Sequence, residues 1–418
     1  MVKPKNSKES LRNNIIALAI VQASNYILPL ISLPYLARVL GAESFGKVVF
    51  AQALMMYFIL LVEYGFSWSA TRKVAENREN RVLLGEIFMN IWAVQWLLIV
   101  LCSVIFVSIV FGVEKFRGEI GFYAAAFLIV LGNVLFPIWF FQGVEKLQLQ
   151  SVLQFAGKLI GLLFIFVLVK NENDGIWVLL SNALSAIIAG LFSIFFIFKS
   201  GYFKICFPSL SGVRQEFVEG FSLFASRVSI SFYTMLIPLA LGWIAGPVAL
   251  AYFNVADKLR VGAQSLITPI SQAIFPRISH LVSKNESSAY QLIKRSAVAI
   301  FLVSGSASLM LFVLSEPLVQ LMAGDGFDGA VSVLHWMSPV PFLVGMSNLF
   351  GVQLMIPLRL NIAFNRILFC AAVLCVIILW PLINYAEASG AAITLMIVEF
   401  FVSVVMFFYL RKKQILGK

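Results

Sequence analysis

Charged residues are scarce in this sequence. Asp, Glu, Lys and Arg make up 12% of its 418 residues, whereas soluble globular domains carry about 25%. Hydrophobic residues reach 61%, and they form long unbroken runs. A transmembrane β-barrel would instead show segments of about ten residues with alternating polarity. The composition therefore excludes a soluble globular protein and predicts an all-α integral membrane protein with several spanning helices.

Histidine and cysteine are also rare, which removes most metal and redox chemistry from consideration. The chain has two histidines and four cysteines, and none has the spacing of a metal or disulfide motif. Segment 324–329 matches the G-x-G-x-x-G pattern, but it follows no predicted strand, so we interpret it as a loop. Because no P-loop and no large loop are present, we expect no enzymatic activity, no cofactor and no metal site.

Apolar runs of membrane-spanning length recur along the whole chain. A helix needs about 20 apolar residues to cross a bilayer, and about twelve segments meet this condition. Segment 248–268 is the weakest of them, because Asp257, Lys258 and Arg260 interrupt it. The predicted spans are 15–36, 47–66, 84–111, 120–141, 152–169, 176–198, 217–243, 248–268, 296–314, 331–354, 361–383 and 390–409.

The basic residues lie mainly on one side of these predicted spans. Most lysines and arginines fall at the chain ends and in the alternate connections that this topology places in the cytoplasm. By the positive-inside rule, the asymmetry predicts that both termini are cytoplasmic. It also accounts for the net charge of +11 without a nucleic-acid partner. The connections on the opposite side hold Arg38, Lys47, Lys115, Arg117 and Lys170.

A connection at about 199–216 divides the chain near its middle and indicates an internal repeat. A shift that places Gly41 on Gly246 also places Arg72 on Arg277 and superimposes one predicted hairpin on another. We therefore expect a parallel repeat of two six-helix bundles around a central cleft. The predicted bundles comprise residues 1–205 and 206–418.

Two strings in the first predicted hairpin carry a family resemblance. They are LPYLARVLGAESFG at 33–46 and VEYGFSWSATRKVA at 62–75. A third segment, 326–330, carries a weaker resemblance. The two strings resemble the N-terminal signature of the O-antigen and polysaccharide flippases. That family belongs to the multidrug/oligosaccharidyl-lipid/polysaccharide (MOP) exporter superfamily.

This resemblance implies a MATE-like fold in the bacterial inner membrane. It implies that an undecaprenyl-diphosphate-linked oligosaccharide is moved from the cytoplasmic to the periplasmic leaflet. Ion-coupled alternating access would drive the step, since the chain contains no P-loop. Membrane lipids, a polysaccharide polymerase and a chain-length regulator are the further partners that the resemblance implies.

Ionisable residues inside the predicted spans are the main candidates for a site. A charge at the bilayer centre is costly and usually faces protein or water. Arg227 and Lys258 both lie about ten residues into their spans, roughly 15 Å deep. Asp257 and Arg260 are three residues apart on one helix and can neutralise each other. The remaining local surplus of charge is positive, which favours an anionic ligand.

The repeat adds polar residues to this set. Positions in the first half that match Arg227 and Asp257 hold Gln22 and Gln52, and Asn25 lies one turn from Gln22. We predict that these residues, together with the basic residues of the second half, line one polar cleft. The alternative interpretation is an interhelical salt bridge that holds the two halves together.

Two further groups of ionisable residues each have two alternative roles. Arg38 and Lys47 flank the turn of the first hairpin, where they either contact a ligand at the outer mouth or extend to the membrane interface. Asp257, Glu63 and Glu399 are the candidate ion-coupling carboxylates. Glu399 is alternatively the partner of a cation on a neighbouring helix.

Three other functions compete with the flippase. A cation-coupled drug or metabolite antiporter of the same superfamily would need an acidic cleft. A peptidoglycan lipid II flippase usually carries more spans, and a membrane glycosyltransferase or polymerase needs a catalytic carboxylate in a large loop. The predicted basic surplus and the short loops favour the oligosaccharide flippase. Its cargo has many hydroxyls that are costly to place in hydrocarbon, whereas its polyprenyl tail can remain in lipid.

Overall fold

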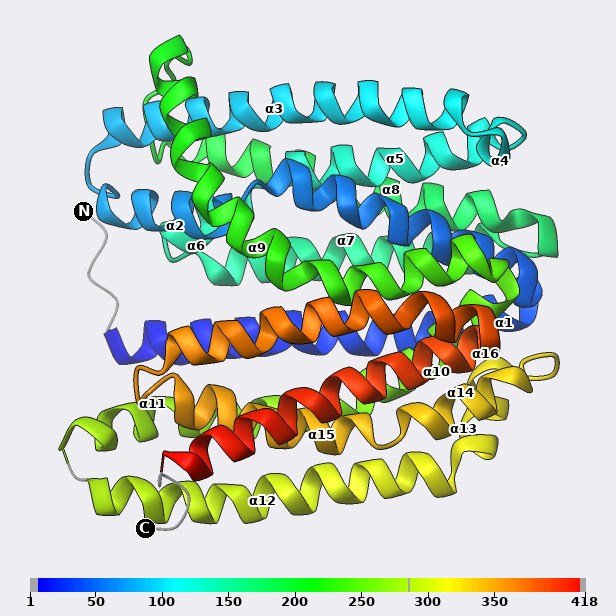
Figure 1. The fold of residues 1–418 in the computed structure, drawn as a ribbon. Coiled ribbons are helices and arrows are strands. Elements are labelled where there is room, and N and C mark those ends of the chain that lie inside the picture. Colours follow the sequence, from blue (N-terminus) through cyan, green and yellow to red (C-terminus); the bar gives the residue numbers. More distant parts are fainter. Residues whose placement is uncertain (1–6, 285, 414–418) are drawn as a thin grey trace. The chain divides into compact units, whose positions relative to one another are not determined.

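Every regular element in the described part of the chain is a helix (Figure 1). The computed structural model describes the chain path for residues 7–284 and 286–413. It describes the side chains of residues 27–413, apart from gaps within 222–234 and 269–290. The chain separates into two compact units. Unit 1 comprises Met1–Leu40 with Ala51–Ser229, and unit 2 comprises Gly41–Phe50 with Ile230–Lys418.

Unit 1 is a bundle of long apolar helices joined by short connections. Its helices are α1 (Ser7–Glu63, except the segment in unit 2), α2 (Phe66–Glu76), α3 (Arg81–Gly112), α4 (Glu114–Arg117), α5 (Ile120–Leu135), α6 (Ile138–Gly143), α7 (Leu147–Leu168), η1 (Glu172–Asp174), α8 (Gly175–Lys199) and the first part of α9 (Leu210–Ile244).

Small residues set the packing of α7 against α8 in unit 1. Gly157 and Gly161 form a G-x-x-x-G stripe on α7, and a Cβ added at either position would lie 2.8 Å from a Cβ of α8. The Ser185 hydroxyl of α8 donates to the Gly157 carbonyl at 2.6 Å. Small residues let two backbones approach closely in a membrane, where lipid already solvates large apolar side chains.

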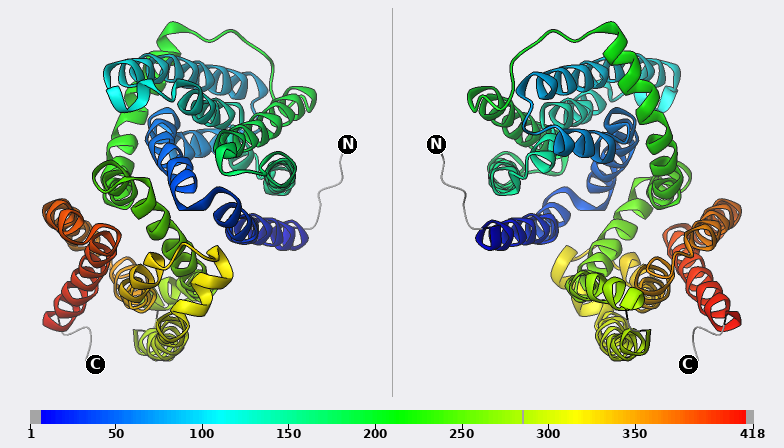
Figure 2. Two further views of the ribbon diagram at one scale, coloured as in Figure 1. Left: turned by 90° about the vertical axis from the view of Figure 1, so that its right-hand side faces the viewer. Right: turned by 90° about the vertical axis from the view of Figure 1, so that its left-hand side faces the viewer.

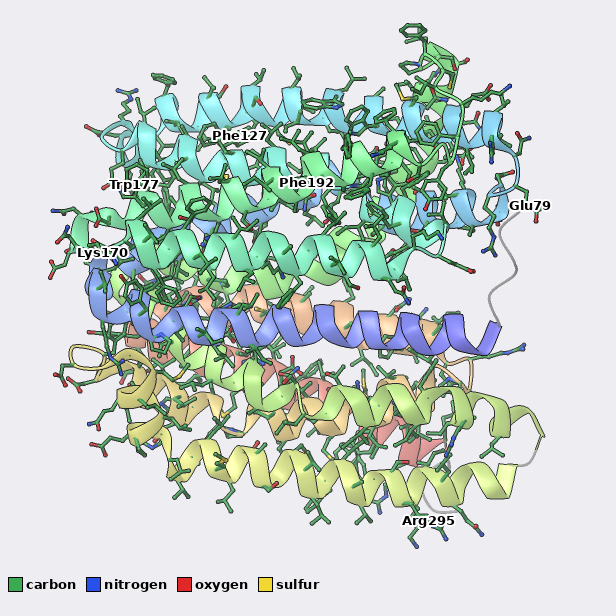
Figure 3. The ribbon with its side chains drawn as sticks, turned by 180° about the vertical axis from the view of Figure 1, so that it is seen from behind. Glu79, Phe127, Lys170, Trp177, Phe192 and Arg295 are labelled. Atoms are coloured by element: carbon green, nitrogen blue, oxygen red, sulfur yellow. The ribbon has the colours of Figure 1, made fainter. Side chains whose placement is uncertain are left out.

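The two ends of unit 1 carry different polar groups. Figure 3 shows Lys170 and Glu79 at opposite ends of its bundle. At one end, the hydroxyl of Tyr35 donates to the Val169 carbonyl at 2.6 Å, and the Lys170 ammonium lies 6.0 Å from the centre of the Tyr35 ring. The sequence predicts that this end is periplasmic and that the Glu79 end is cytoplasmic. That orientation stays a prediction.

Unit 2 is a second helical bundle that contains one segment of α1. Its helices are the end of α9, α10 (Gly246–Gln264), α11 (Ile267–Lys284), α12 (Glu286–Val313), α13 (Ser315–Ala323), α14 (Gly329–Met337), α15 (Val340–Ser347), the π-helix η2 (Asn348–Met355) and α16 (Asn361–Lys412).

The α1 segment Gly41–Phe50 packs into unit 2 through a bare backbone contact. A Cβ added at Gly46 would lie 1.9 Å from the Pro247 carbonyl oxygen, so only glycine permits this approach. The Phe45 ring packs edge-on against Phe327, with ring centroids 6.3 Å apart. The tip of the first hairpin is therefore part of the unit 2 core.

Substituting this glycine should measurably loosen unit 2. We expect Gly46→Ala to destabilise the protein by about 1–3 kcal/mol, because the new methyl group must displace backbone. Gly121→Ala is the matched control, since a Cβ there meets nothing within 4 Å. Thermal unfolding of the two purified variants in one detergent makes the comparison. Equal melting temperatures would contradict the close contact at Gly46.

The long helices α1 and α16 each contain residues with non-helical backbone angles. In α1 the break is at Gly41, which has φ 68°. In α16 it is at Ala386 and Glu387, and the two halves of α16 diverge from this point (Figure 2). Gly246, the position that the repeat aligns with Gly41, also has a positive φ of 88°. The predicted alignment thus pairs two glycines that both have a positive φ.

The structure confirms the all-α fold class, while the count of about twelve spans stays a prediction. The described residues contain eight helical segments long and apolar enough to cross a membrane. One of these, Asn361–Lys412, covers two predicted spans, and Ile27–Glu76 covers the predicted span 47–66 and the last part of 15–36. The predicted spans 217–243 and 248–268 are not among the eight. The predicted division after residue 205 also stays a prediction, because the compact units change over within α9.

Candidate functional site

A polar groove in unit 2 is the candidate site. It consists of two cavities of about 420 and 380 Å³ that share Gln264, Val344, Asn348 and Val352 in their walls. Helices α9, α10, α11, α15, η2 and α16 supply the walls. We call this pair of cavities the unit 2 groove. The polar side chains that line it are Asp257, Arg260, Gln264, Thr268, Ser271, Ser347, Asn348, Gln353 and Glu399.

One end of the groove is charged. Arg260 binds Asp257 through Nη2 at 2.7 Å and through Nε at 2.8 Å, in both cases to Oδ1. Its Nη1 donates to the Gln264 Oε1 at 2.5 Å. The positive charge of Arg260 also acts on Glu399, which α16 brings into the same cavity. The end thus contains one guanidinium and two carboxyl groups, and the guanidinium already has partners.

The other end of the groove is built from amides and hydroxyls. The Ser271 hydroxyl donates to the Asn348 Oδ1 at 2.8 Å, and the Gln353 Nε2 donates to the Ser271 carbonyl at 3.0 Å. Gln353 is fully buried, and its Oε1 has no hydrogen-bond partner in the described part of the chain. A buried acceptor without a donor costs about 1–3 kcal/mol, so a ligand that brings a hydrogen-bond donor to this oxygen would gain free energy.

The π-helix explains why Asn348 and Gln353 reach one groove. In an α-helix, residues five apart point about 140° away from each other. The π-helix η2 instead forms i→i+5 bonds, such as that from the Ile356 N–H to the Gly351 carbonyl at 3.1 Å. This wider turn returns residues five apart to similar directions. Such turns occur frequently at functional sites.

The structure brings together three residues of the predicted site. Asp257, Arg260 and Glu399 all line the unit 2 groove. The predicted neutralisation of Asp257 by Arg260 is confirmed by their ion pair. Lys258 is half-buried on the same helix and does not belong to the described lining of either cavity.

Other predicted residues lie elsewhere or cannot be placed. Arg38 is exposed, and Gln52 and Glu63 are half-buried on α1. The Lys47 ammonium lies 3.5 Å from the Glu43 carboxylate, one helical turn away. The side chains of Arg227, Gln22 and Asn25 lie outside the described residues.

Sequence reasoning missed the amide end of the groove. Gln264, Ser271, Asn348 and Gln353 are uncharged, and a search for ionisable residues in apolar runs passes over them. A usable signal was nevertheless present, because two amides interrupt the apolar run 331–354. Residues five apart do not share one face of a regular α-helix, so this spacing indicates a departure from α-helical geometry.

A second buried charge cluster lies in unit 1. The Lys73 ammonium of α2 is 2.8 Å from Glu216 and 2.7 Å from Glu219, both on α9. Beside it, the Tyr64 ring stacks on Phe217 at a centroid distance of 4.8 Å. Lys73 and Glu216 are both largely buried. We interpret this cluster as the structural attachment of α9 within unit 1.

The fold resembles that of a solved MATE family transporter. The chain superposes with a TM-score of 0.74 on a solved structure described as "Inward-facing conformation of a multidrug resistance MATE family transporter of the MOP superfamily". The match covers 96% of this chain and 98% of that chain at 15% sequence identity. At this identity the likeness shows the fold alone, an all-helical multi-pass membrane protein.

The chain belongs to the polysaccharide biosynthesis protein family, whose model matches residues 11–282. Two relatives share the name "Putative O-antigen transporter". One, from Escherichia coli strain K12, is 36% identical over 98% of this chain and 99% of its own length. The other, from Shigella dysenteriae, is 30% identical over 93% of this chain and 97% of its own length. The family predicted from the N-terminal strings is confirmed.

Proposed function

We propose that this protein is a flippase for lipid-linked oligosaccharides of the O-antigen type. It moves undecaprenyl-diphosphate-linked repeat units from the cytoplasmic to the periplasmic leaflet of the bacterial inner membrane, with both termini in the cytoplasm. The observation that carries this proposal is the 36% identity, along nearly the whole chain, to a relative named as an O-antigen transporter. A polysaccharide polymerase and a chain-length regulator are the proposed protein partners.

Physical chemistry supports a polar path for this cargo. Each sugar hydroxyl that loses water without gaining a hydrogen bond costs several kcal/mol in hydrocarbon. The headgroup therefore has to cross against polar side chains, while the polyprenyl tail remains in lipid. Rocking of one repeat against the other would expose such side chains to each leaflet in turn.

We divide the proposed roles of the ionisable residues according to their partners. Arg227 and Lys258 are the proposed contacts of the diphosphate, with Gln22, Asn25 and Gln52 across from them and with Arg38 and Lys47 at the outer mouth. Arg260 is bound to Asp257 and Gln264, so we assign it to the groove rather than to the diphosphate. Asp257 and Glu399, followed by Glu63, are the proposed ion-coupling carboxylates.

Purified protein in liposomes tests the proposed function directly. A fluorescent undecaprenyl-diphosphate oligosaccharide, placed in both leaflets, should become fully accessible to an external quencher in minutes when the protein is present. Without protein, about half of the probe should stay protected, because a headgroup with many hydroxyls crosses a bilayer very slowly. Protection that persists with folded protein under an imposed proton or sodium gradient would contradict the proposal.

The acidic residues of the groove favour one alternative. Asp257 and Glu399 both line it, and a pair of carboxyl groups suits an organic cation, as in a cation-coupled drug or metabolite antiporter. Ethidium efflux from everted vesicles separates the two functions. The flippase predicts no efflux above vesicles that lack the protein, whereas the antiporter predicts gradient-dependent efflux.

A further inference from the structure

We propose that the unit 2 groove is a subsite for an uncharged, hydroxyl-rich sugar of the cargo, and not for its diphosphate. This inference rests on the proposed function and adds to it the part of the substrate that the groove recognises. It depends on the charge of the groove, on its amide end and on the apolar surfaces beside them.

The charge of the groove disfavours a diphosphate. Arg260 is the one basic side chain among the described residues of its lining, and Asp257 and Gln264 already accept its hydrogen bonds. Glu399 adds a second carboxyl group at the same end. A phosphate group would meet at least as much negative as positive charge here. A sugar without charge does not incur this repulsion.

The amide end has hydrogen-bonding groups that a sugar hydroxyl can match. Gln264, Asn348 and Gln353 each combine an acceptor oxygen with an NH₂ donor, and a hydroxyl both donates and accepts. The unpartnered Oε1 of buried Gln353, a residue in the wall of one cavity, favours a ligand that carries hydrogen-bond donors. This oxygen needs a hydrogen-bond donor, which a sugar hydroxyl supplies. The oxygens of an ionised diphosphate only accept, so they would leave it unsatisfied.

The apolar walls and the size of the groove also suit a sugar ring. Phe275 lines one cavity, and Phe253 and Phe364 line the other. These aromatic side chains can pack against the C–H surfaces of a sugar while the amides bind its hydroxyls. Each cavity lies within the range of about 300–1,000 Å³ that is usual for small-molecule sites.

Binding measurements with two probes test this inference. The probes are undecaprenyl diphosphate and the same lipid carrying one oligosaccharide repeat unit, titrated into the full-length protein in nanodiscs. We expect the wild-type protein to bind the sugar-bearing lipid at least tenfold more tightly than the bare diphosphate lipid. In Gln353→Leu and Asn348→Leu this ratio should fall to within twofold of unity, while the affinity for the bare lipid stays unchanged.

Gln95→Leu is the matched control. Gln95 is also a buried glutamine whose Oε1 has no partner in the described part of the chain, but it lies on α3 in unit 1. Its variant should keep the wild-type ratio. The melting temperature of each variant is compared with that of the wild type. Gln353→Leu removes an unsatisfied acceptor together with one hydrogen bond to the Ser271 carbonyl, and a folded protein is expected.

The possible outcomes separate the two proposals. If the wild-type protein binds neither lipid, the proposed function itself fails. The sugar subsite is overturned, with the flippase intact, if the wild type shows no preference for the sugar-bearing lipid. It is equally overturned if Gln353→Leu and Asn348→Leu keep the wild-type ratio, or if they lose affinity for the bare diphosphate lipid instead.

Discussion

Replacing Lys73 with alanine should destabilise the protein by about 3–5 kcal/mol. Its ammonium group contacts Glu216 at 2.8 Å and Glu219 at 2.7 Å, and the Glu216 side chain is 9% exposed. Removing the cation leaves a buried carboxylate without compensation, which costs far more than a surface ion pair contributes. Equilibrium unfolding of the purified protein in detergent and denaturant measures the loss.

The neighbouring residue supplies a matched control for Lys73. Arg72 faces Glu76 at 4.0 Å on the same helix, but both side chains are more than 60% exposed. Exposed pairs contribute about 0–1 kcal/mol, so Arg72→Ala should change the stability by less than that. In the double variant Lys73→Met, Glu216→Met most of the stability should return, because no buried charge remains unpaired. Equal losses in Lys73→Ala and Arg72→Ala would show that the cluster does not attach α9.

Replacing Arg260 with leucine should reduce export of surface polysaccharide at least tenfold. The change leaves Asp257 and Glu399 facing the unit 2 groove without a cation. Two carboxyl groups in one cavity then favour protonation, which removes the charge that we assign to ion coupling. Polysaccharide at the cell surface is measured in a strain that lacks its own copy of the transporter, and membrane abundance is measured in parallel.

A double variant separates transport from folding at this pair. Arg260→Leu, Asp257→Asn removes the unpaired charge at Asp257 and should restore membrane abundance, but it should not restore export. Arg366→Leu is the control, because Arg366 is exposed on α16 and lies outside the groove. If the double variant exported normally, Asp257 and Arg260 would form a structural salt bridge only.

The charge hypothesis from the sequence needed one revision. The sequence placed Arg260 with Arg227 and Lys258 in one polar cleft for an anionic ligand, although it also predicted that Asp257 neutralises Arg260. In the folded protein, Arg260 is held by Asp257 and Gln264 and lies near Glu399, which is far away in the sequence. The unit 2 groove is therefore a mixed-charge and amide surface. The roles proposed for Arg227 and Lys258 are unaffected by this revision.

Composition and local spacing were sufficient to predict the class of the protein and the features that act over short distances. The shortage of charge and the long apolar runs required helices in a membrane, since a bilayer leaves backbone groups no other partners. The 33–46 and 62–75 strings identified the family, and the spacing of three predicted the Asp257–Arg260 pair. The alignment of Gly41 with Gly246 likewise matched two glycines with positive φ. A tight turn often needs a residue with positive φ, which glycine adopts without steric cost.

The assembly of the candidate site depends on contacts between segments that are distant in the sequence. The packing of Gly41–Phe50 into unit 2, the π-turn at Asn348 and the bond from Gln353 to Ser271 join segments that no local pattern links. Hydropathy records how apolar a segment is, but it does not record which face meets which neighbour. Uncharged amides change the hydropathy of a segment only slightly. That they lie together in one groove is visible only in the folded chain.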